Sequence, residues 1–557
     1  MINLTEIRPG AYYDSVVLMQ LQRQLAALPG VDDAGVVMAT PANKELLKDF
    51  DLLTEDGDRA NPDDLLIVVR AATEKDGQTA LSQIDELLKR RRSSVSEEFR
   101  PKSLDAAVKQ LPEASLVMIS VPGRYAAGVA DEALHQGKHV FLYSDNVSLE
   151  DELKLKEKGR QAGLLVMGPD CGTAIINGIG LGFANRVRTG SIGVVGASGT
   201  GIQAITSEVH NLGGGISHAI GTGGRDLKGK IGAITASQGL DLLARDDNTK
   251  VIVIVSKPPD PEIAADLLGR ARAAGKPVVI NFIGFPPPAR SIGNLYFAAS
   301  LDEAAQLAVE LSAKPAASFQ EKPSDSAGFL RGLFSGGTLA YEAMLGFQTI
   351  LSPIFSNVPI IPEQKLDDPL SSKSHTVIDL GEDVFTQGRL HPMMDNDLRI
   401  RRLRQELEDP VTGVILLDIV LGEGSHPDPA SELAPEIARG KKARPEIDFL
   451  IVMVGTDEDP QGIDEQSQQF IEAGAKVFRK VSEVIAYLGV SQSTKNTAGV
   501  PVSLESIQSD LAAINIGVES FYDSLKSQGA AVVQVDWRPP AGGNEKLMDI
   551  LARMKTG

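Results

Sequence analysis

The chain of 557 residues is poor in several features that define whole classes of proteins. Its one cysteine, Cys171, excludes an intrachain disulfide framework and is typical of a reducing compartment. No apolar run reaches the roughly 18 residues that a membrane helix requires. No basic segment followed by an apolar one opens the chain, as it does in a secretory signal. We therefore expect a cytoplasmic protein that has no membrane partner.

Positive charge is scarce as well. The chain has 55 lysines and arginines against 74 acidic residues, a formal net charge of -19, and no long run of either sign. A protein that binds nucleic acid usually shows a basic patch or stripe that faces the phosphates. The composition therefore argues against a nucleic-acid partner.

The chain is rich in short apolar runs of strand length, such as "KVIVIVS" and "GVILLDIVLG", which are typical of buried parallel strands. They alternate with amphipathic helices, and this order predicts right-handed crossovers in an α/β protein. A charged, serine-containing stretch, "KRRRSSVSEEFRPKS", is a candidate linker. We predict a small N-terminal α/β domain, three doubly wound parallel-sheet domains and a C-terminal helical or extended segment. The predicted ranges are 1–100, 101–187, 188–320, 321–492 and 493–557.

Two glycine-rich turns, "GASGTG" and "SGGT", follow predicted strands and precede predicted helices. At such a turn, the unpaired N–H groups of the helix start can hold an anion, and glycine lets the backbone approach it closely. Neither turn has the lysine of a P-loop, so we expect one small phosphoryl group rather than a triphosphate. The alternative is a tight connection with an N-cap and no ligand. The predicted phosphate-binding residues are Ser198, Gly199, Thr200, Ser335, Gly336, Gly337 and Thr338.

Longer segments show a family resemblance. The runs "VMISVPGRYAAGVADEALHQGKHVFLYSDNV", "LLVMGPDCGTAI" and "GSIGVVGASGTG" resemble, in this order, the α subunit of succinyl-CoA synthetase. The segments "FSGGTLAYEAM", "IDLGED" and "LLDIVLGEG" look like the C-terminal domain of its β subunit. The opening "YYDSVVLMQLQRQLAALPG" and the closing "VQVDWRPPAGG" are similar to the FdrA family of acyl-CoA-synthetase-like proteins, and this likeness covers nearly the whole chain.

The resemblance implies a Rossmann-like CoA-binding-type domain at 101–187 and flavodoxin-like ligase-type domains at 188–320 and 321–492. It also implies that the helices that start near Ser198 and Gly336 share one phosphate, as paired helices do around the phosphohistidine of the synthetases. The chain departs from that pattern in three ways: it has Asn294 where the histidine would fall, only one glycine in "VVRAATEKDGQTA", and no room for an ATP-grasp domain.

These departures favour chemistry without a phosphoenzyme. FdrA-like proteins are associated with oxamate carbamoyltransferase, in which oxalurate and phosphate give oxamate and carbamoyl phosphate in anaerobic allantoin and purine catabolism. We therefore predict a subunit of a carbamoyl-transferring enzyme, with no metal and no bound cofactor. The alternatives are an acyl-CoA synthetase similar to succinyl-CoA ligase, and a noncatalytic scaffold of that fold.

The resemblance also implies further site residues. His391 lies in a loop that matches one facing the synthetase site, where it could polarise a carbonyl or shuttle a proton, and Arg389 could clamp a carboxylate. For both residues the alternative is an ordinary loop or surface position. The other candidates are Cys171, Gly172, Arg225, Gly422, Gly424 and Ser425.

The predicted partners are a small-molecule substrate (oxalurate or oxamate, phosphate or carbamoyl phosphate) and other protein subunits of the same pathway. No polar cluster for an amide-bearing substrate stands out beside the phosphate turns, so a partner chain could supply it. Trp537 and Arg538 are of the residue types that anchor interfaces, although a tryptophan that seals a domain core is the alternative.

Overall fold

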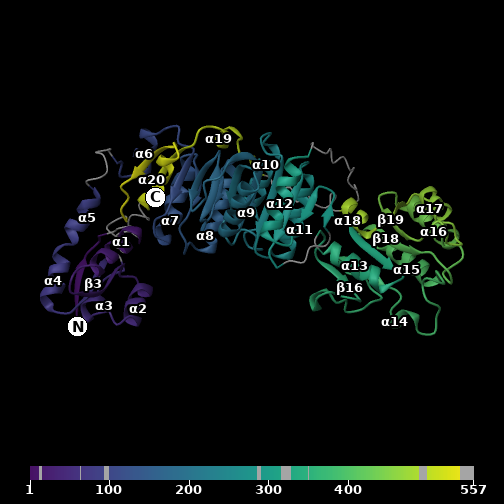
Figure 1. Ribbon diagram of the computed structural model, residues 1–557. Helices are drawn as coiled ribbons and strands as arrows, with labels where there is room; N and C mark the ends of the chain where they lie inside the picture. Colours follow the sequence, from purple (N-terminus) through teal and green to yellow (C-terminus); the bar gives the residue numbers. More distant parts are fainter. Residues whose placement is uncertain are drawn as a thin grey trace, which may run out of the picture. The chain divides into compact units, whose positions relative to one another are not determined.

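The computed structural model describes residues 1–11, 15–62, 64–92, 100–284, 290–314, 328–348, 350–488 and 499–539 (Figure 1). The chain divides into two compact units. One contains Met1–Leu155, Gly168–Asp170 and Ser509–Gly557, and the other contains Lys156–Met167 and Cys171–Gln508. Part of the predicted linker, at 93–99, and the predicted boundary near 320 lie outside the described residues.

The N-terminal domain is built on a three-stranded antiparallel sheet in the order β1-β3-β2. Leu65 and Ile67 of the central strand enter one apolar cluster, and Leu66 and Val68 enter another, so both faces of this strand are buried. The elements are β1 (Ile2–Arg8), α1 (Ser15–Ala26), β2 (Val31–Met38), α2 (Pro41–Asp49), α3 (Glu55–Asp58), β3 (Leu65–Ala71), α4 (Glu74–Ser82) and α5 (Ile84–Arg92).

The second sheet has five strands in the order β22-β21-β4-β5-β6. Two of them come from the C-terminal segment, which the sequence analysis treats as separate from this domain. Ala513 pairs with Leu116, and Ile516 pairs with Ile119, in parallel register. The elements are α6 (Leu104–Gln110), β4 (Leu116–Ile119), α7 (Gly123–His135), β5 (His139–Leu142), α8 (Leu149–Ala162), β6 (Val166–Met167), β21 (Ala512–Ile516), α20 (Glu519–Ser527) and β22 (Ala531–Val535).

The third sheet has eight strands in the order β13-β14-β12-β11-β9-β10-β7-β8. Its first hairpin, β7 and β8, lies inside the range predicted for the preceding domain and pairs antiparallel with β10. Helices α9 and α12 cover one face, and α10 and α11 cover the other. The elements are β7 (Thr173–Ile176), β8 (Ile179–Gly182), β9 (Thr189–Gly196), α9 (Gly199–Asn211), β10 (Ile216–Gly221), α10 (Ile234–Arg245), β11 (Val251–Ser256), α11 (Pro261–Ala273), β12 (Val278–Phe282), β13 (Ser291–Ile292), β14 (Leu295–Phe297) and α12 (Leu301–Ser312).

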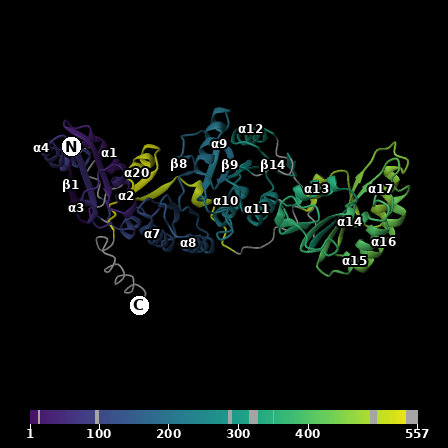
Figure 2. The same ribbon diagram turned by 90° about the horizontal axis from the view of Figure 1, so that it is seen from below.

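The fourth sheet is parallel throughout, in the order β16-β17-β15-β18-β19-β20. Helices α13 and α18 pack on one face and α15, α16 and α17 on the other. Figure 2 shows α13 across the sheet from α16 and α17. The elements are β15 (Phe329–Phe334), α13 (Gly337–Phe347), β16 (Ile354–Ser356), η1 (Pro362–Gln364), β17 (His375–Asp379), α14 (Asp383–Thr386), α15 (Asp397–Glu408), β18 (Thr412–Val420), α16 (Pro429–Ala443), β19 (Asp448–Val454), α17 (Ile463–Glu472), β20 (Lys476–Phe478) and α18 (Val481–Leu488), with α19 (Glu505–Gln508) beyond them.

The predicted fold class is confirmed. In the third and fourth sheets the first parallel strand, β9 or β15, lies between parallel strands that follow it in the chain, which is the strand order of doubly wound flavodoxin-like sheets. In such sheets ligands bind at the carboxyl ends of the strands, where the winding direction changes. Both glycine-rich turns lie at that place. No helix in the described part of the chain has the length and apolar character that a membrane crossing needs.

Candidate functional site

The first candidate site is the turn between β9 and α9. Ser198 is the N-cap of α9, and its hydroxyl accepts a hydrogen bond from the N–H of Gly201 at 3.2 Å. The N–H groups of Gly199 and Thr200, in the first turn of the helix, have no partner within the helix. They point outward at the positive end of the helix dipole. The structure therefore brings together the donors that the sequence predicts at this turn.

The hydroxyl of Thr173 adds a polar group that the sequence analysis missed. Thr173 is buried at the start of β7, and its Oγ1 atom has no hydrogen-bond partner among the described residues. A Cβ atom placed on Gly199 would lie 3.6 Å from that oxygen, so the hydroxyl faces the start of α9. A buried hydroxyl without a partner costs about 1–3 kcal/mol. An anion at the helix start could accept a hydrogen bond from it.

The other candidates near this turn are packed into the fold. Cys171 is 3% exposed, and its thiol donates to the carbonyl of Thr173 at 3.7 Å. A Cβ atom on Gly221 would lie 2.5 Å from its sulfur, so this cysteine fills a tight space under β10. Gly172 and Arg225 are half-buried, Arg225 in the loop after β10.

A buried ion pair holds that loop. The Nζ atom of Lys156 lies 2.7 Å from Oδ1 of Asp226 and donates to the carbonyl of Thr222 at 2.9 Å. Asp226 also accepts the N–H groups of Thr235 and Ala236 at the start of α10. Lys156 is far from this loop in sequence, and nothing in the pattern of its own helix singles it out. Sequence reasoning therefore had no signal for this pair.

The second candidate site is the turn between β15 and α13, and it differs from the first. Ser335 is fully buried, and Asp418 of β18 accepts its N–H at 2.7 Å and its hydroxyl at 2.9 Å. The guanidinium of Arg399 lies 3.2 Å from Asp418, which is also fully buried. The Ser335 hydroxyl that the sequence predicts for phosphate is therefore already occupied. Gly336 and Gly337 are half-buried, and Thr338 is exposed.

A second carboxylate, that of Asp379 at the end of β17, faces the same turn. Its Oδ1 atom accepts the N–H of Gly381 at 2.8 Å. Its Oδ2 atom lies 2.8 Å from the point where a Cβ atom on Gly337 would stand. Burial raises the pKa of Asp379, the charges of Glu382 and Asp418 raise it further, and the Gly381 N–H and His391 oppose the rise.

His391 lies beside Asp379. A Cβ atom on Gly381 would be 3.0 Å from Nε2 of His391 and 3.1 Å from Oδ1 of Asp379, so both atoms border one small space. The Nδ1 atom of His391 accepts the N–H of Met393 at 3.2 Å, so a neutral ring carries its proton on Nε2. Arg389, the other predicted catalytic residue, is exposed in the same loop.

The loop after β18 completes this edge of the sheet. The side chain of Gln461 bonds both the N–H and the carbonyl of Gly422, and the N–H of His426 donates to the carbonyl of Met393. Helix α16 begins only after Asp428, whose carboxylate caps it. The predicted residues Gly422, Gly424 and Ser425 therefore lie in the loop that leads to this helix and not at the helix start. Gly424 is exposed, and the other two are half-buried.

Asn294, a departure from the synthetase pattern, and Trp537, a predicted interface anchor, both contact other residues of the fold. Asn294 is 1% exposed at the amino end of β14, where its amide donates to the carbonyls of Ala271 and Lys276. Trp537 is half-buried, with its ring 5.4 Å from that of Tyr125 in an edge-on arrangement, whereas Arg538 is exposed.

Comparison with protein families supports the architecture. A CoA-ligase model matches residues 333–487, and a CoA binding domain model matches residues 187–284. The CoA-binding match thus falls on the sheet that carries the Ser198 turn, whereas the sequence analysis predicts the CoA-binding-type domain at 101–187. Together with the doubly wound sheets, these matches define an acyl-CoA synthetase-like protein with CoA-binding and CoA-ligase domains.

Comparison with individual proteins is more specific. The chain is 42% identical over 485 residues to the uncharacterized protein YahF of Escherichia coli K12, a match that covers 84% of this chain and 94% of YahF. The chain therefore belongs to the YahF family and is itself succinyl-CoA synthetase-like. It is also 30% identical over 199 residues to succinate–CoA ligase [ADP-forming] subunit alpha 2 of Archaeoglobus fulgidus, covering 34% of this chain and 67% of that subunit.

Among solved structures, the dinucleotide-forming acetyl-coenzyme A synthetase 1 of Ca. Korarchaeum cryptofilum matches at 18% identity and a TM-score of 0.30. The match covers 70% of this chain and 84% of the synthetase chain.

The N-terminal domain matches a model described as the AllF heavy metal-associated domain, over residues 1–103. This stretch contains no cysteine and no histidine, which are the ligands that soft heavy metals prefer. The described residues include no group of three or more side chains that could hold a metal ion. The residues of this domain therefore do not fit a heavy metal.

Proposed function

We propose that the chain is an acyl-CoA synthetase-like transferase that binds a phosphoryl group at the start of α9. The observation that carries this proposal is the Thr173 hydroxyl, which has no hydrogen-bond partner among the described residues and lies 3.6 Å from the Cβ position of Gly199. At this helix start the N–H groups of Gly199 and Thr200 have no partner within the helix. Phosphate oxygens accept hydrogen bonds from such donors, and the helix dipole favours their charge. The CoA-binding match over 187–284 includes this turn.

The class of reaction is acyl transfer to or from phosphate. In this chemistry the helix start holds the phosphate, while backbone N–H groups polarise the neighbouring carbonyl as negative charge develops on its oxygen. The relation to succinate–CoA ligase supports a CoA thioester as one of the acyl donors or products. The glycine-rich turn at 196–201 lies within the matched CoA-binding domain, so the single glycine in "VVRAATEKDGQTA" no longer argues against CoA.

A second candidate is carbamoyl transfer of the FdrA type, in which oxalurate and phosphate give oxamate and carbamoyl phosphate. One observation favours it: the segment 283–294 that follows β12 contains no histidine. A phosphohistidine relay through this segment is therefore excluded. Direct transfer of the carbamoyl group to phosphate needs no phosphohistidine. We also propose that partner subunits of the pathway contribute to the active assembly, with Arg538 as an exposed candidate contact.

Isothermal titration of the purified chain with inorganic phosphate tests the site. Gly199→Val adds a side chain beside the Thr173 hydroxyl, in the space proposed for the phosphate, and we expect at least about a tenfold loss of phosphate affinity, the loss of one to two hydrogen bonds to a charged group. Gly128→Val, in α7, where an added Cβ meets nothing within 4 Å, is the matched control and should leave the affinity unchanged. Equal phosphate affinity in the two variants contradicts the proposed phosphate site at the start of α9.

The two candidate reactions are separated by product. The chain is incubated with phosphate and either an acyl-CoA or oxalurate, alone and with co-expressed partners, and acyl phosphate or carbamoyl phosphate is measured. We expect the active reaction to be lost in Gly199→Val and kept in Gly128→Val. Formation of neither product by any assembly contradicts the proposed transfer chemistry.

A further inference from the structure

One edge of the N-terminal sheet, strand β1, is open. β1 lies at the end of the order β1-β3-β2, and its seven residues are exposed or half-buried. Beyond its ladder with β3, the backbone of β1 forms one hydrogen bond with the described residues, in which the N–H of Ala11 donates to the carbonyl of Arg8. About half of the N–H and carbonyl groups of an edge strand point away from its sheet. β1 therefore presents a row of donors and acceptors on which another strand can pair.

The other sheet edges in the described part of the chain are short or protected. β2, at the opposite edge of the same sheet, carries Asp32 and Asp33 and shifts its register against β3 between Val31 and Asp33. The edge strands of the remaining sheets, which are β6, β8, β13, β16, β20 and β22, have two to five residues. Short strands, charges and bulges keep natural sheet edges from pairing. β1 has seven residues and no register shift, and its two charges, Glu6 and Arg8, form an ion pair with an N–O distance of 2.6 Å.

The sequence of β1, INLTEIR, is suited to pairing with a second copy of itself. When two copies overlap over their full length in antiparallel orientation, Thr5 faces Thr5 at the two-fold axis. Glu6 then faces Leu4 of the other copy, and Arg8 faces Ile2. Threonine pairs stabilise antiparallel strands, and no like charges stand directly opposite each other in this register. Two-fold symmetry is also the commonest symmetry of protein oligomers.

An exposed aromatic side chain lies beside this edge. Phe50, at the end of α2, is 59% exposed. The carbonyl of Asp51 accepts from the side-chain amide of Asn3 at 2.7 Å, and the carbonyl of Phe50 accepts from Arg70, which pairs with Asn3 in the ladder. Asn3 and Ile7 lie on the sheet face that α2 covers. In the antiparallel pair Asn3 faces Ile7 of the second copy, so Phe50 has an apolar side chain of that copy to pack against.

We propose that β1 pairs antiparallel with β1 of a second copy of this chain, so that two three-stranded sheets join into one sheet of six strands. The occupant is a second copy because the full-overlap register sets threonine against threonine and leaves no charge facing a like charge. The N-terminal domain, whose residues do not fit a heavy metal, serves assembly in this arrangement. This interface goes beyond the proposed function and does not depend on the phosphate site.

Sedimentation velocity of the full chain tests the interface over about a hundredfold range of concentration, because association follows mass action. We expect a species of twice the 59.2 kDa chain mass. Phe50→Lys places a charge at each Phe50 contact and should weaken association at least about tenfold, as expected for the loss of a partly buried aromatic side chain. Met19→Lys is the matched control, since Met19 is 51% exposed on α1, which covers the opposite face of the sheet. A wild-type chain that stays monomeric, or a dimer equally strong in the two variants, overturns the proposal.

Disulfide cross-linking tests the register. Residues directly opposite each other in an antiparallel pair have Cα atoms about 4.5–5.5 Å apart, a separation that a disulfide spans. Thr5→Cys should therefore form a reducible covalent dimer on oxidation with diamide. Asp32→Cys, exposed on the β2 edge, is the control and should form at least about tenfold less. The natural Cys171 is 3% exposed and should remain unreacted. Equal cross-linking of the two variants overturns the proposal.

Hydrogen exchange of the wild type covers the case that Thr5→Cys disturbs folding, because Thr5 shares a hydrogen bond with Thr54. Peptides from β1 should exchange at least about tenfold more slowly in the dimer than in the monomer that dilution or Phe50→Lys yields, because the outward N–H groups are bonded only in the pair. Peptides from β2 should exchange at the same rate in both states. Exchange of β1 that does not differ between the two states overturns the proposal.

Discussion

At the scale of single residues, the histidines show that burial can determine the role of a side chain more than its chemical type does. His375 is 4% exposed at the start of β17, where its Nδ1 atom accepts the N–H of Leu330 at 3.1 Å. Burial, together with the charge of Arg331, lowers its pKa from 6.5 to about 4. Protonation of the ring would break this hydrogen bond and bury a charge. The residue is therefore a neutral structural acceptor and unsuited to proton transfer.

Stability should depend on pH because of this histidine. The unfolded chain takes up a proton on His375 near pH 6.5, whereas the folded chain does so only near pH 4, so the free energy of unfolding falls as the pH drops through this window. The difference corresponds to about 3 kcal/mol at most. His375→Asn keeps an acceptor and removes the titration. Its free energy of unfolding should therefore fall less than that of the wild type between pH 6.5 and 4.

Urea denaturation at a series of pH values, followed by far-UV circular dichroism, checks this dependence. His135→Asn changes an exposed histidine of α7 and should follow the wild-type curve. His139, whose pKa burial also lowers to about 4, remains in every variant, so part of the acid sensitivity should persist. If the free energy of unfolding falls equally with pH in the wild type and in His375→Asn, the role of His375 as a neutral structural acceptor is ruled out.

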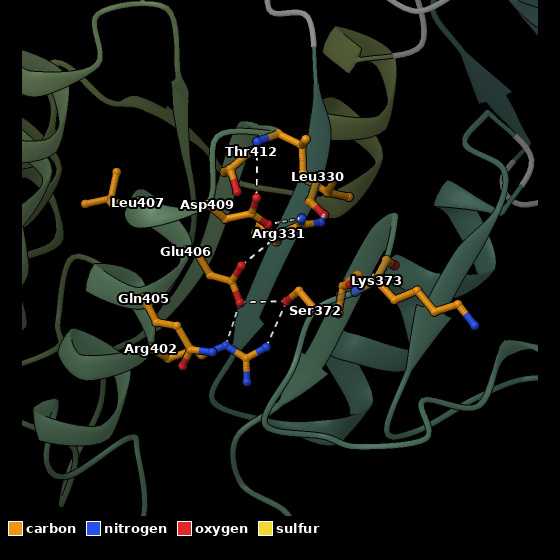
Figure 3. A network of polar contacts seen from close by, with 12 residues as sticks. Leu330, Arg331, Ser372, Lys373, Arg402, Gln405, Glu406, Leu407, Asp409 and Thr412 are labelled. Atoms are coloured by element: carbon orange, nitrogen blue, oxygen red, sulfur yellow. Dashed lines mark hydrogen bonds and ion pairs between the residues drawn. The ribbon is translucent and has the colours of Figure 1, made fainter.

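At the scale of elements, a buried ionic network ties β15, α15 and the loop before β17 (Figure 3). Arg331 of β15 lies 2.8 Å from Glu406 as an ion pair, without the alignment of a hydrogen bond, and 2.7 Å from Asp409. Glu406 also accepts from Arg402 and from the Ser372 hydroxyl, each at 2.6 Å. Two nearly buried guanidinium groups therefore share the carboxylate of Glu406.

Removing that carboxylate should be strongly destabilising. Glu406→Gln leaves Arg331 and Arg402 buried without their shared negative charge, and loss of one partner from a buried pair typically costs about 3–5 kcal/mol. Glu408→Gln, an exposed position two residues further along the same helix, is the matched control and should change stability by less than about 0.5 kcal/mol. Thermal unfolding of the two variants checks the difference. Equal melting temperatures would mean that the network contributes little.

The elements also show what the sequence can predict. Apolar runs and glycine turns located the strands around Ser198 and Ser335, because burial and backbone geometry leave local patterns. The difference between the two turns was not predictable, since Asp379 and Thr173 approach them from other strands. Ser335 looked like a free donor for the same reason: its partner, Asp418, is 83 residues away. Local patterns place a turn, but the facing strand determines its chemistry.

At the scale of the whole molecule, one compact unit is built from both ends of the chain. From the sequence, residues 493–557 are predicted to be a separate segment, because a strand such as "AAVVQV" does not reveal its partner. In the structure β21 pairs with β4, and Ala513, Ile514 and Ile516 are buried at that contact. The parallel pairing needs a very long connection, which in this chain contains the other unit.

This arrangement predicts that the C-terminal strands are required for the fold of the β4 and β5 region. A chain that ends at residue 508 lacks β21 and β22, so one edge of β4 loses its hydrogen-bond partners and its apolar cover. Burial of each large aliphatic side chain contributes about 1.5–3 kcal/mol, so the loss of several exceeds the margin of a typical domain. Hydrogen exchange in peptides from 116–142 should therefore speed up at least a hundredfold.

Peptides from β9 and β15, whose sheets keep all their strands, should exchange as in the full chain. A chain that ends at residue 539 keeps both strands and serves as the control. Unchanged protection of β4 in the shorter chain would show that its sheet is stable without the C-terminal strands.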